Sequence, residues 1–192
     1  MSPALKWMLC SVLAAPAWML FVPPLARAQT TVLPATKENN DYQEASVLFR
    51  NGQYDRALQR IDAWLKTRPK DARGRFLRGM IFAQQKKLDE AARVYTDLTQ
   101  DFPELPEPYN NLAVIYAERG ELDRARSLLE SALRANAKFS AAHENLGDIH
   151  ARLAAASYEQ ALKLDAGNKA VAAKLKAVND LIPTHAAVPG KP

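Results

Sequence analysis

Two histidines and a glutamate come closest to a chemical site in this sequence. His143 and His150 are seven residues apart, which is about two turns of a helix, and Glu144 follows the first of them. This spacing puts both imidazoles on one helix face, whereas helical zinc pairs are four residues apart. We therefore favour packing within the fold over a metal site for these side chains.

No other catalytic or nucleotide-binding pattern is present. The sequence lacks Gly-x-Gly-x-x-Gly, a phosphate-binding Gly-Lys-Ser and Gly-x-Ser-x-Gly. The single cysteine, Cys10, lies in the N-terminal leader, which leaves the rest of the chain without a thiol nucleophile. Acidic residues such as Glu90, Glu121 and Asp123 stand where helices are expected to begin, and the helix dipole favours them there. We expect no enzyme activity, no cofactor, no metal and no small-molecule substrate.

The leader, residues 1–28, has the composition of a secretory signal peptide. Lys6 provides the positive start, Trp7 to Val22 is apolar, and Ala-Arg-Ala at 26–28 offers the small residues that signal peptidase requires. We expect cleavage after Ala28 and export to the periplasm. The alternative is an uncleaved membrane anchor, because the apolar run is near the lower length limit for spanning a bilayer.

Composition favours a single helical domain. Only 7 of 192 residues are glycine and 48% are hydrophobic, which argues against an all-β fold with glycine-rich turns. The formal net charge of +5 is mild, and basic residues such as Arg119, Arg124 and Arg126 alternate with acids. Nucleic-acid binding normally uses a one-sided basic stripe. We therefore expect no nucleic-acid partner.

An internal repeat with a period of thirty-four positions runs through the middle of the chain. Small residues recur at Ala45, Gly79, Ala113 and Gly147, and alanines recur at positions 57, 91 and 125. Glycine is suited to the turn that ends a helix, as near positions 52 and 120, because it adopts positive φ without strain. Each unit is therefore predicted to be two helices joined by a tight turn, with small residues where the helices cross closely.

These units resemble the tetratricopeptide repeat (TPR) family. The third unit matches the family pattern best, at Tyr109, Leu112, Ala113, Tyr116, Gly120, Ala125, Leu129 and Ala132. The resemblance implies an all-α fold, a right-handed α-solenoid of helix–turn–helix repeats. Three full repeats are expected over 38–71, 72–105 and 106–139, after a leader segment over 29–37.

The fourth unit departs from the pattern. Ala161 follows His150 by eleven positions, whereas Ala132 follows Tyr116 by sixteen, so the five residues of the turn are missing. Alanines at 154–156 favour helix. We predict one long helix over 140–165, then a helix over 168–182 that caps the solenoid, and a disordered tail over 183–192. The capping helix has its apolar residues on one face, at Val171, Leu175, Val178 and Ile182.

The resemblance also implies a binding surface, because ligand peptides usually lie along the first helices of TPR units, on the concave side. These helices offer apolar side chains, amides and, towards the C-terminal end, acids. Projected onto this sequence, the candidates are Asn39, Tyr42, Gln43, Ser46 and Phe49 in unit one; Arg73, Phe76, Leu77 and Met80 in unit two; Asn110, Asn111, Val114 and Glu118 in unit three; and Glu144, Asn145, Asp148 and Arg152 in unit four.

The carboxylate clamp of this family, which needs Lys or Arg with Asn, is not matched. The corresponding positions hold Tyr42, Ser46, Glu107 and Asn111. The expected function is a protein–protein interaction adaptor or scaffold of the bacterial cell envelope, which binds a partner peptide or helix and assists complex assembly. The alternative is a membrane-tethered structural protein or a self-associating one, with dimerisation through the 168–182 helix and a membrane link only if the leader is uncleaved.

Overall fold

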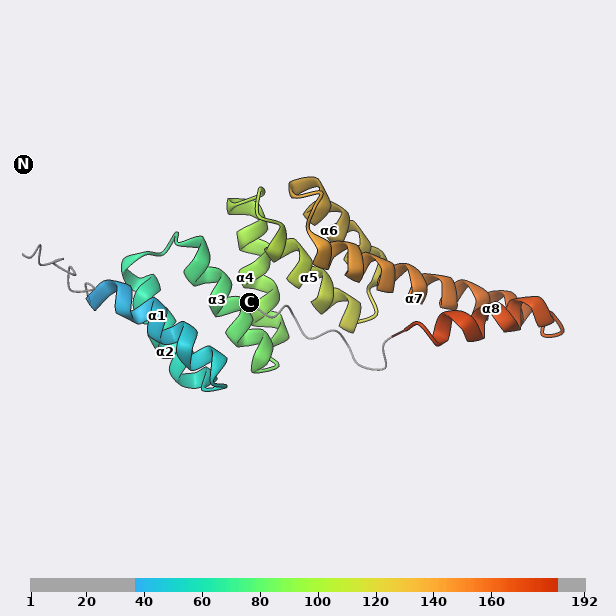
Figure 1. Ribbon diagram of the computed structural model, residues 1–192, viewed down its shortest axis with the longest axis horizontal. Coiled ribbons are helices and arrows are strands. Elements are labelled where there is room, and N and C mark those ends of the chain that lie inside the picture. The colour runs from blue at the N-terminus through green and yellow to red at the C-terminus, as the bar shows by residue number, and fades with distance from the viewer. Residues whose placement is uncertain (1–36, 183–192) are drawn as a thin grey trace, which may run out of the picture. The chain divides into compact units, whose positions relative to one another are not determined.

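The computed structural model describes residues 37–182, and its side chains from residue 41 onward (Figure 1). Within this range the chain forms helices and short connections, with no strand. The predicted signal peptide, the leader segment up to residue 36 and the predicted tail over 183–192 lie outside the described residues. No described helix is long and apolar enough to cross a membrane. The helices are α1 (Lys37–Arg50), α2 (Tyr54–Thr67), α3 (Ala72–Gln84), α4 (Leu88–Asp101), α5 (Pro106–Glu118), α6 (Leu122–Ala135), α7 (Ser140–Leu164) and α8 (Lys169–Asn179).

The first six helices form three hairpins. α1 pairs with α2, α3 with α4 and α5 with α6, and each hairpin packs on the next through α2 and α3 or α4 and α5. The turn inside each hairpin contains one residue with positive φ, namely Gly52 at +73°, Lys86 at +60° and Gly120 at +79°. These three positions are one repeat length apart, so the repeat in the sequence is also a repeat in backbone conformation.

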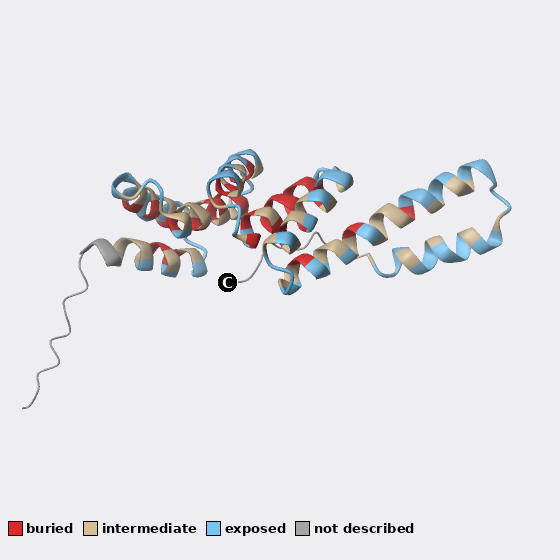
Figure 2. Cartoon of the chain, turned by 90° about the horizontal axis from the view of Figure 1, so that it is seen from above, coloured by how far each residue is buried: buried red, intermediate tan, exposed pale blue. Residues whose placement is uncertain are grey.

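The core lies between the paired helices, as the burial colours of Figure 2 show. Gly79 of α3 illustrates why a small residue recurs there, because a Cβ atom at this position would lie 2.7 Å from the ring of Tyr95 in α4. Trp64 of α2 is buried, and its Nε1 donates a hydrogen bond to Asp71 Oδ2 at 2.7 Å. Asp71 also caps α3, because its Oδ1 accepts from the backbone N–H groups of Arg73 and Gly74.

The predicted long helix is confirmed, because α7 runs without interruption over 25 residues. Ala154, which is one repeat length after Gly120, is helical where the earlier units turn. The connection between α7 and α8, residues 165–168, has the same length as the connections between units at 68–71, 102–105 and 136–139. The fourth unit has therefore lost its internal turn but kept the connection that follows a unit, and α8 occupies the sequence position of the first helix of a fifth unit.

Two packing predictions for the fourth unit are wrong. The repeat pattern predicts a close helix crossing at Gly147 and a packed side chain at His150, yet both residues are exposed. A Cβ atom on Gly147 would meet nothing within 4 Å. The reason is that, within residues 37–182, no second helix folds back over this part of α7. The capping helix ends at Asn179, three residues before the predicted end; it packs on α7 and contributes no fully buried residue (Figure 2).

Candidate functional site

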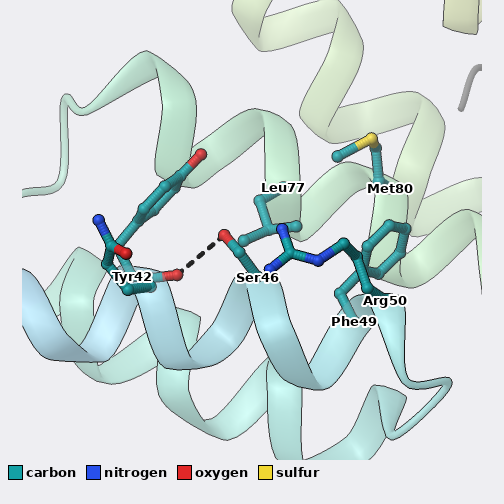
Figure 3. Close-up of a pocket in the computed structure, with 7 residues that line it drawn as sticks. Tyr42, Ser46, Phe49, Arg50, Leu77 and Met80 are labelled. Atoms are coloured by element: carbon teal, nitrogen blue, oxygen red, sulfur yellow. Dashed lines mark hydrogen bonds between the residues drawn. The ribbon is translucent and has the colours of Figure 1, made fainter. Parts of the chain in front are cut away.

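A pocket of about 340 Å³ lies between α1 and α3 (Figure 3). Its walls are aromatic and aliphatic, with polar groups from α1 at its edge. It brings together six of the predicted binding residues and one residue that the sequence analysis missed. The lining is Tyr42, Gln43, Ser46, Phe49 and Arg50 from α1 and Leu77 and Met80 from α3.

The helical spacing of α1 puts these side chains on one face. Residues 42, 46, 49 and 50 lie at intervals that define a stripe along a helix. Ala45 and Leu48 lie on the other face and are buried against α2. Ser46 Oγ donates to the Tyr42 carbonyl at 2.9 Å, so its proton is already in use within α1.

The aromatic walls are held from behind by α2. The Tyr42 ring lies 5.8 Å from the Trp64 ring, and the Phe49 ring lies 5.8 Å from the Tyr54 ring, both in tilted arrangements. Such arrangements stabilise aromatic pairs beyond the burial of their area. Leu77, the α3 wall, is itself buried in the core. Packing within the chain therefore holds three walls of the pocket in place, namely Tyr42, Phe49 and Leu77.

Arg50 is the functional candidate that sequence reasoning missed. It is the last residue of α1, it is exposed, and it forms no ion pair with a described residue. Its position four residues after Ser46, on the same helix face, was the signal that could have found it. Arg73, the predicted basic residue of unit two, has its guanidinium 5.5 Å from the Tyr42 ring centroid and its Nε 3.8 Å from Asp71 Oδ1. Two cationic side chains thus accompany the apolar walls.

The predicted residues of unit three are placed differently, because α5 packs against α4, α6 and α7. Asn110, Asn111 and Val114 are all buried. Asn111 Nδ2 donates to the Tyr95 hydroxyl at 3.2 Å, and Asn110 Nδ2 donates to Asn111 Oδ1 at 3.4 Å. These amides are engaged inside the chain, so their role towards a partner stays a prediction.

The same amide network reaches into the neighbouring units. Asn145 Nδ2 of α7 donates to Asn110 Oδ1 at 2.8 Å. At the α4 end of the network, burial raises the pKa of the Tyr95 hydroxyl above its ordinary value. The hydrogen bond with Asn111 lowers this pKa, but its effect is smaller than that of burial. Phe76, also predicted to line the groove, is partly buried with its ring 5.7 Å from the Tyr95 ring. The network connects α4, α5 and α7 and is structural in its geometry.

The acidic residues of the predicted surface lie on α7. Burial raises the pKa of Asp148, and the nearby charge of Glu144 raises it further, while Arg152 lowers it. Glu144 is exposed and Asp148 is half-buried. In the part of the chain that the structure describes, no three His, Cys, Asp or Glu residues are grouped in a way that could hold a metal ion.

Sequence comparison supplies the family. Two models described as tetratricopeptide repeat match residues 42–106 and 82–149. The chain belongs to the tetratricopeptide repeat family. Its eight described helices form a TPR α-solenoid of three full repeats, a fused fourth and the capping helix α8. No match to a curated protein sequence was found.

Solved TPR structures are similar in fold. The first TPR of Spaghetti (RPAP3), bound to the HSP90 peptide SRMEEVD, has a TM-score of 0.57 at 18% identity, over 62% of this chain and 95% of that one. A thermophilic TPR protein of Thermus thermophilus has a TM-score of 0.57 at 24% identity, over 75% of this chain and 82% of that one. YrrB, described as a TPR protein with an unusual peptide-binding site, has a TM-score of 0.53 at 24% identity, over 56% of each chain.

Proposed function

We propose that this TPR protein binds a segment of a partner protein without catalysing a reaction, and that the pocket between α1 and α3 receives an apolar side chain of that segment. The observation that carries the proposal is the pocket itself, whose walls of Tyr42, Phe49, Leu77 and Met80 are fixed by α2 and the core. Aromatic and methionine side chains are enriched in protein interfaces. A preformed pocket also lowers the entropic cost of binding.

The charges beside the pocket indicate the chemistry of the segment. Arg50 has no ion pair with a described residue and lines the pocket, and Arg73 lies against the Tyr42 ring. A carboxylate next to the apolar side chain of the partner would pair with either guanidinium. The amide of Gln43 remains for the partner's backbone. The occupant is therefore a short peptide segment that combines a large apolar residue with an acidic one.

Peptide binding by related structures supports this proposal. The RPAP3 domain named above is bound to a peptide that contains two glutamates and an aspartate, and YrrB is described by its peptide-binding site. The identities are too low to transfer either site, and the pattern of the carboxylate clamp is not matched here. What the comparison supports is the class of ligand, a peptide, while the pocket between α1 and α3 gives the local specificity.

The setting that we propose is the bacterial periplasm, where the protein would act as an adaptor in the assembly of a cell-envelope complex. The support comes from the leader, with its positive start, apolar run and small residues at 26 and 28. N-terminal sequencing of the exported protein tests this part alone. A first residue of Gln29 agrees with the proposal, and a first residue of Met1 contradicts it.

The binding site is tested by selecting a displayed library of random peptides on the purified chain, followed by fluorescence anisotropy with the selected peptides. We expect a consensus of an apolar residue next to Asp or Glu. Ser46→Trp fills the pocket and should lower affinity at least about tenfold, and Arg50→Glu should lower it less. A peptide set with no such consensus contradicts the proposed specificity.

Ser127→Trp is the matched control for Ser46→Trp. Ser127 of α6 is exposed, and its Oγ donates to the carbonyl four residues earlier, as Ser46 does, at 3.0 Å. The two variants therefore remove the same kind of hydrogen bond and add the same side chain. Equal affinity of the Ser46 variant and the wild-type chain would reject the pocket as the binding site.

A further inference from the structure

The second helices of the repeats show an unexplained difference in burial. In α2, α4 and α6 the inward positions are no more than 1% exposed, at Ala57, Ala91, Ala125, Ile61, Tyr95 and Leu129. By the spacing of the repeat, with five residues missing, Ala154 and Tyr158 of α7 hold the same positions. Both are partly exposed. The C-terminal half of α7 thus carries the inward face of a second helix, but among the described residues it has no first helix of its own unit to pack against, and its neighbour is α8.

The N-terminal half of α7 has the complementary surface, the inward face of a first helix. Leu48, Phe82 and Tyr116 of the preceding first helices are buried under their second helices. His150, in the same position, is exposed, and Gly147 has open space where its Cβ atom would be. This half of α7 therefore has the inward face of a first helix, and none of the described helices packs on it as a second helix.

The two faces are matched in size, repeat by repeat. In the first and third units the first helix has an alanine, at 45 and 113, and the second helix has Ile61 and Leu129. In the second unit the first helix has Gly79, and the larger ring of Tyr95 in the second helix packs on this glycine. The fourth unit pairs Gly147 with Tyr158, as the second unit does. These two residues are eleven positions apart on one continuous helix, roughly 16 Å along its axis, so they do not meet within one chain.

We propose that two copies of this chain exchange their fourth repeats, with their α7 helices packed antiparallel about a two-fold axis near Leu153. The two helices of a TPR hairpin are antiparallel, so this arrangement rebuilds the missing hairpin twice. The Gly147 half of each copy is covered by the Tyr158 half of the other. The contact is isologous and closed, as expected for a symmetric dimer, and a hinge that cannot turn favours such an exchange.

The sequence indicates that a second copy of this chain covers the N-terminal half of α7. A partner of this surface must present the inward face of a TPR second helix, and the chain itself carries such a face at Ala154, Tyr158 and Ala161, which are all only partly buried. Each α8 follows its own α7 and lies beside it in the exchanged unit. Neither α1 nor α3 takes part, so the inference is independent of the proposed peptide pocket.

The test is size-exclusion chromatography with light scattering on the purified chain and three variants. One variant restores the turn by inserting Arg-Gly-Glu-Leu-Asp, the sequence of residues 119–123, between Arg152 and Leu153. The second is Gly147→Phe, which blocks the surface. The third, Ala156→Phe, is the control, because position 156 is exposed here and so are its equivalents Gln59, Arg93 and Ser127.

We expect a dimer for the wild-type chain and for Ala156→Phe. The insertion variant should be a monomer with undiminished helical circular dichroism, and Gly147→Phe should weaken the dimer at least about tenfold. A wild-type chain with the mass of one copy at every soluble concentration would overturn the proposal. A dimer that survives both the insertion and Gly147→Phe would overturn it as well, since its interface must then lie elsewhere.

Discussion

The third and fourth repeats have nearly the same side-chain pattern, but the fourth lacks the five residues that form the turn of the third. In the third repeat Gly120 reverses the chain with a φ of +79°, and Leu129 and Ala132 of α6 close over α5. In the fourth repeat the chain continues as helix through Ala154. The residues that would form the first and the second helix of a hairpin therefore follow one another along α7. The side-chain pattern of a TPR unit therefore does not by itself produce a hairpin, because the turn must also be present.

A polar contact that links successive repeats is also lost at the fourth repeat. Gln85 Nε2 donates to Asp55 at 2.7 Å, and Arg119, one repeat length later, donates to Asp89 at 2.6 Å. The next pair in this series is Leu153 and Asp123, and Asp123 instead forms an ion pair with Arg126 on its own helix at 3.0 Å. The residue after the first helix has thus become apolar where the turn is lost.

The largest expected change in unfolding free energy comes from comparing a buried leucine of the third repeat with an exposed leucine of the fourth. Leu129→Ala removes a fully buried side chain of α6 and should cost about 2–5 kcal/mol of unfolding free energy. Leu164→Ala, at the end of α7, removes a leucine that is 82% exposed and should change it by less than about 0.5 kcal/mol. Urea unfolding at one chain concentration measures both. A cost above about 1 kcal/mol at Leu164 would show that this part of α7 is covered in a way the account does not contain.

A smaller effect tests the turn against the helix. Gly120→Ala places a Cβ atom at positive φ and should cost about 1–2 kcal/mol. Ala156→Gly, at an exposed position within α7, should cost about 0.5–1 kcal/mol because glycine loses more backbone freedom in a helix. The same unfolding experiment applies. A neutral or stabilising glycine at 156 would indicate a turn there and contradict the continuous helix.

The smallest effect is electrostatic. Because burial and Glu144 raise the pKa of Asp148 in the folded chain, its contribution to stability is largest when it is protonated and is lost as the pH rises through that raised pKa. Asp148→Asn should therefore raise Tm at pH 7 by less than about 3 °C. The difference should vanish below the unfolded carboxyl pKa of about 3.9. A lower Tm for the variant at pH 7 would show that the attraction of Arg152 prevails.

The sequence predicted the repeat, the hairpins and the fused helix, since all three depend on local spacing. Six of the seven residues that line the pocket are among those predicted to line the groove, because their positions on α1 and α3 follow from helical periodicity, and their role in binding stays a prediction. It did not predict the burial of Asn110 and Asn111, which follows from α5 being packed against three helices. It also missed the exposure of Gly147 and His150, because the pattern specifies an inward face but not whether a helix arrives to cover it.

The continuity of α7 is the claim on which this comparison depends, and a distance between two spin labels tests it most directly. Labels on cysteines replacing the exposed His143 and Leu164, with Cys10 changed to Ser and the labelled chain diluted in unlabelled copies, report the distance within one chain. A continuous helix predicts a backbone separation of roughly 31 Å. A separation close to the helix-to-helix spacing of about 10 Å would mean that the fourth repeat folds back as a hairpin, and it would contradict the account.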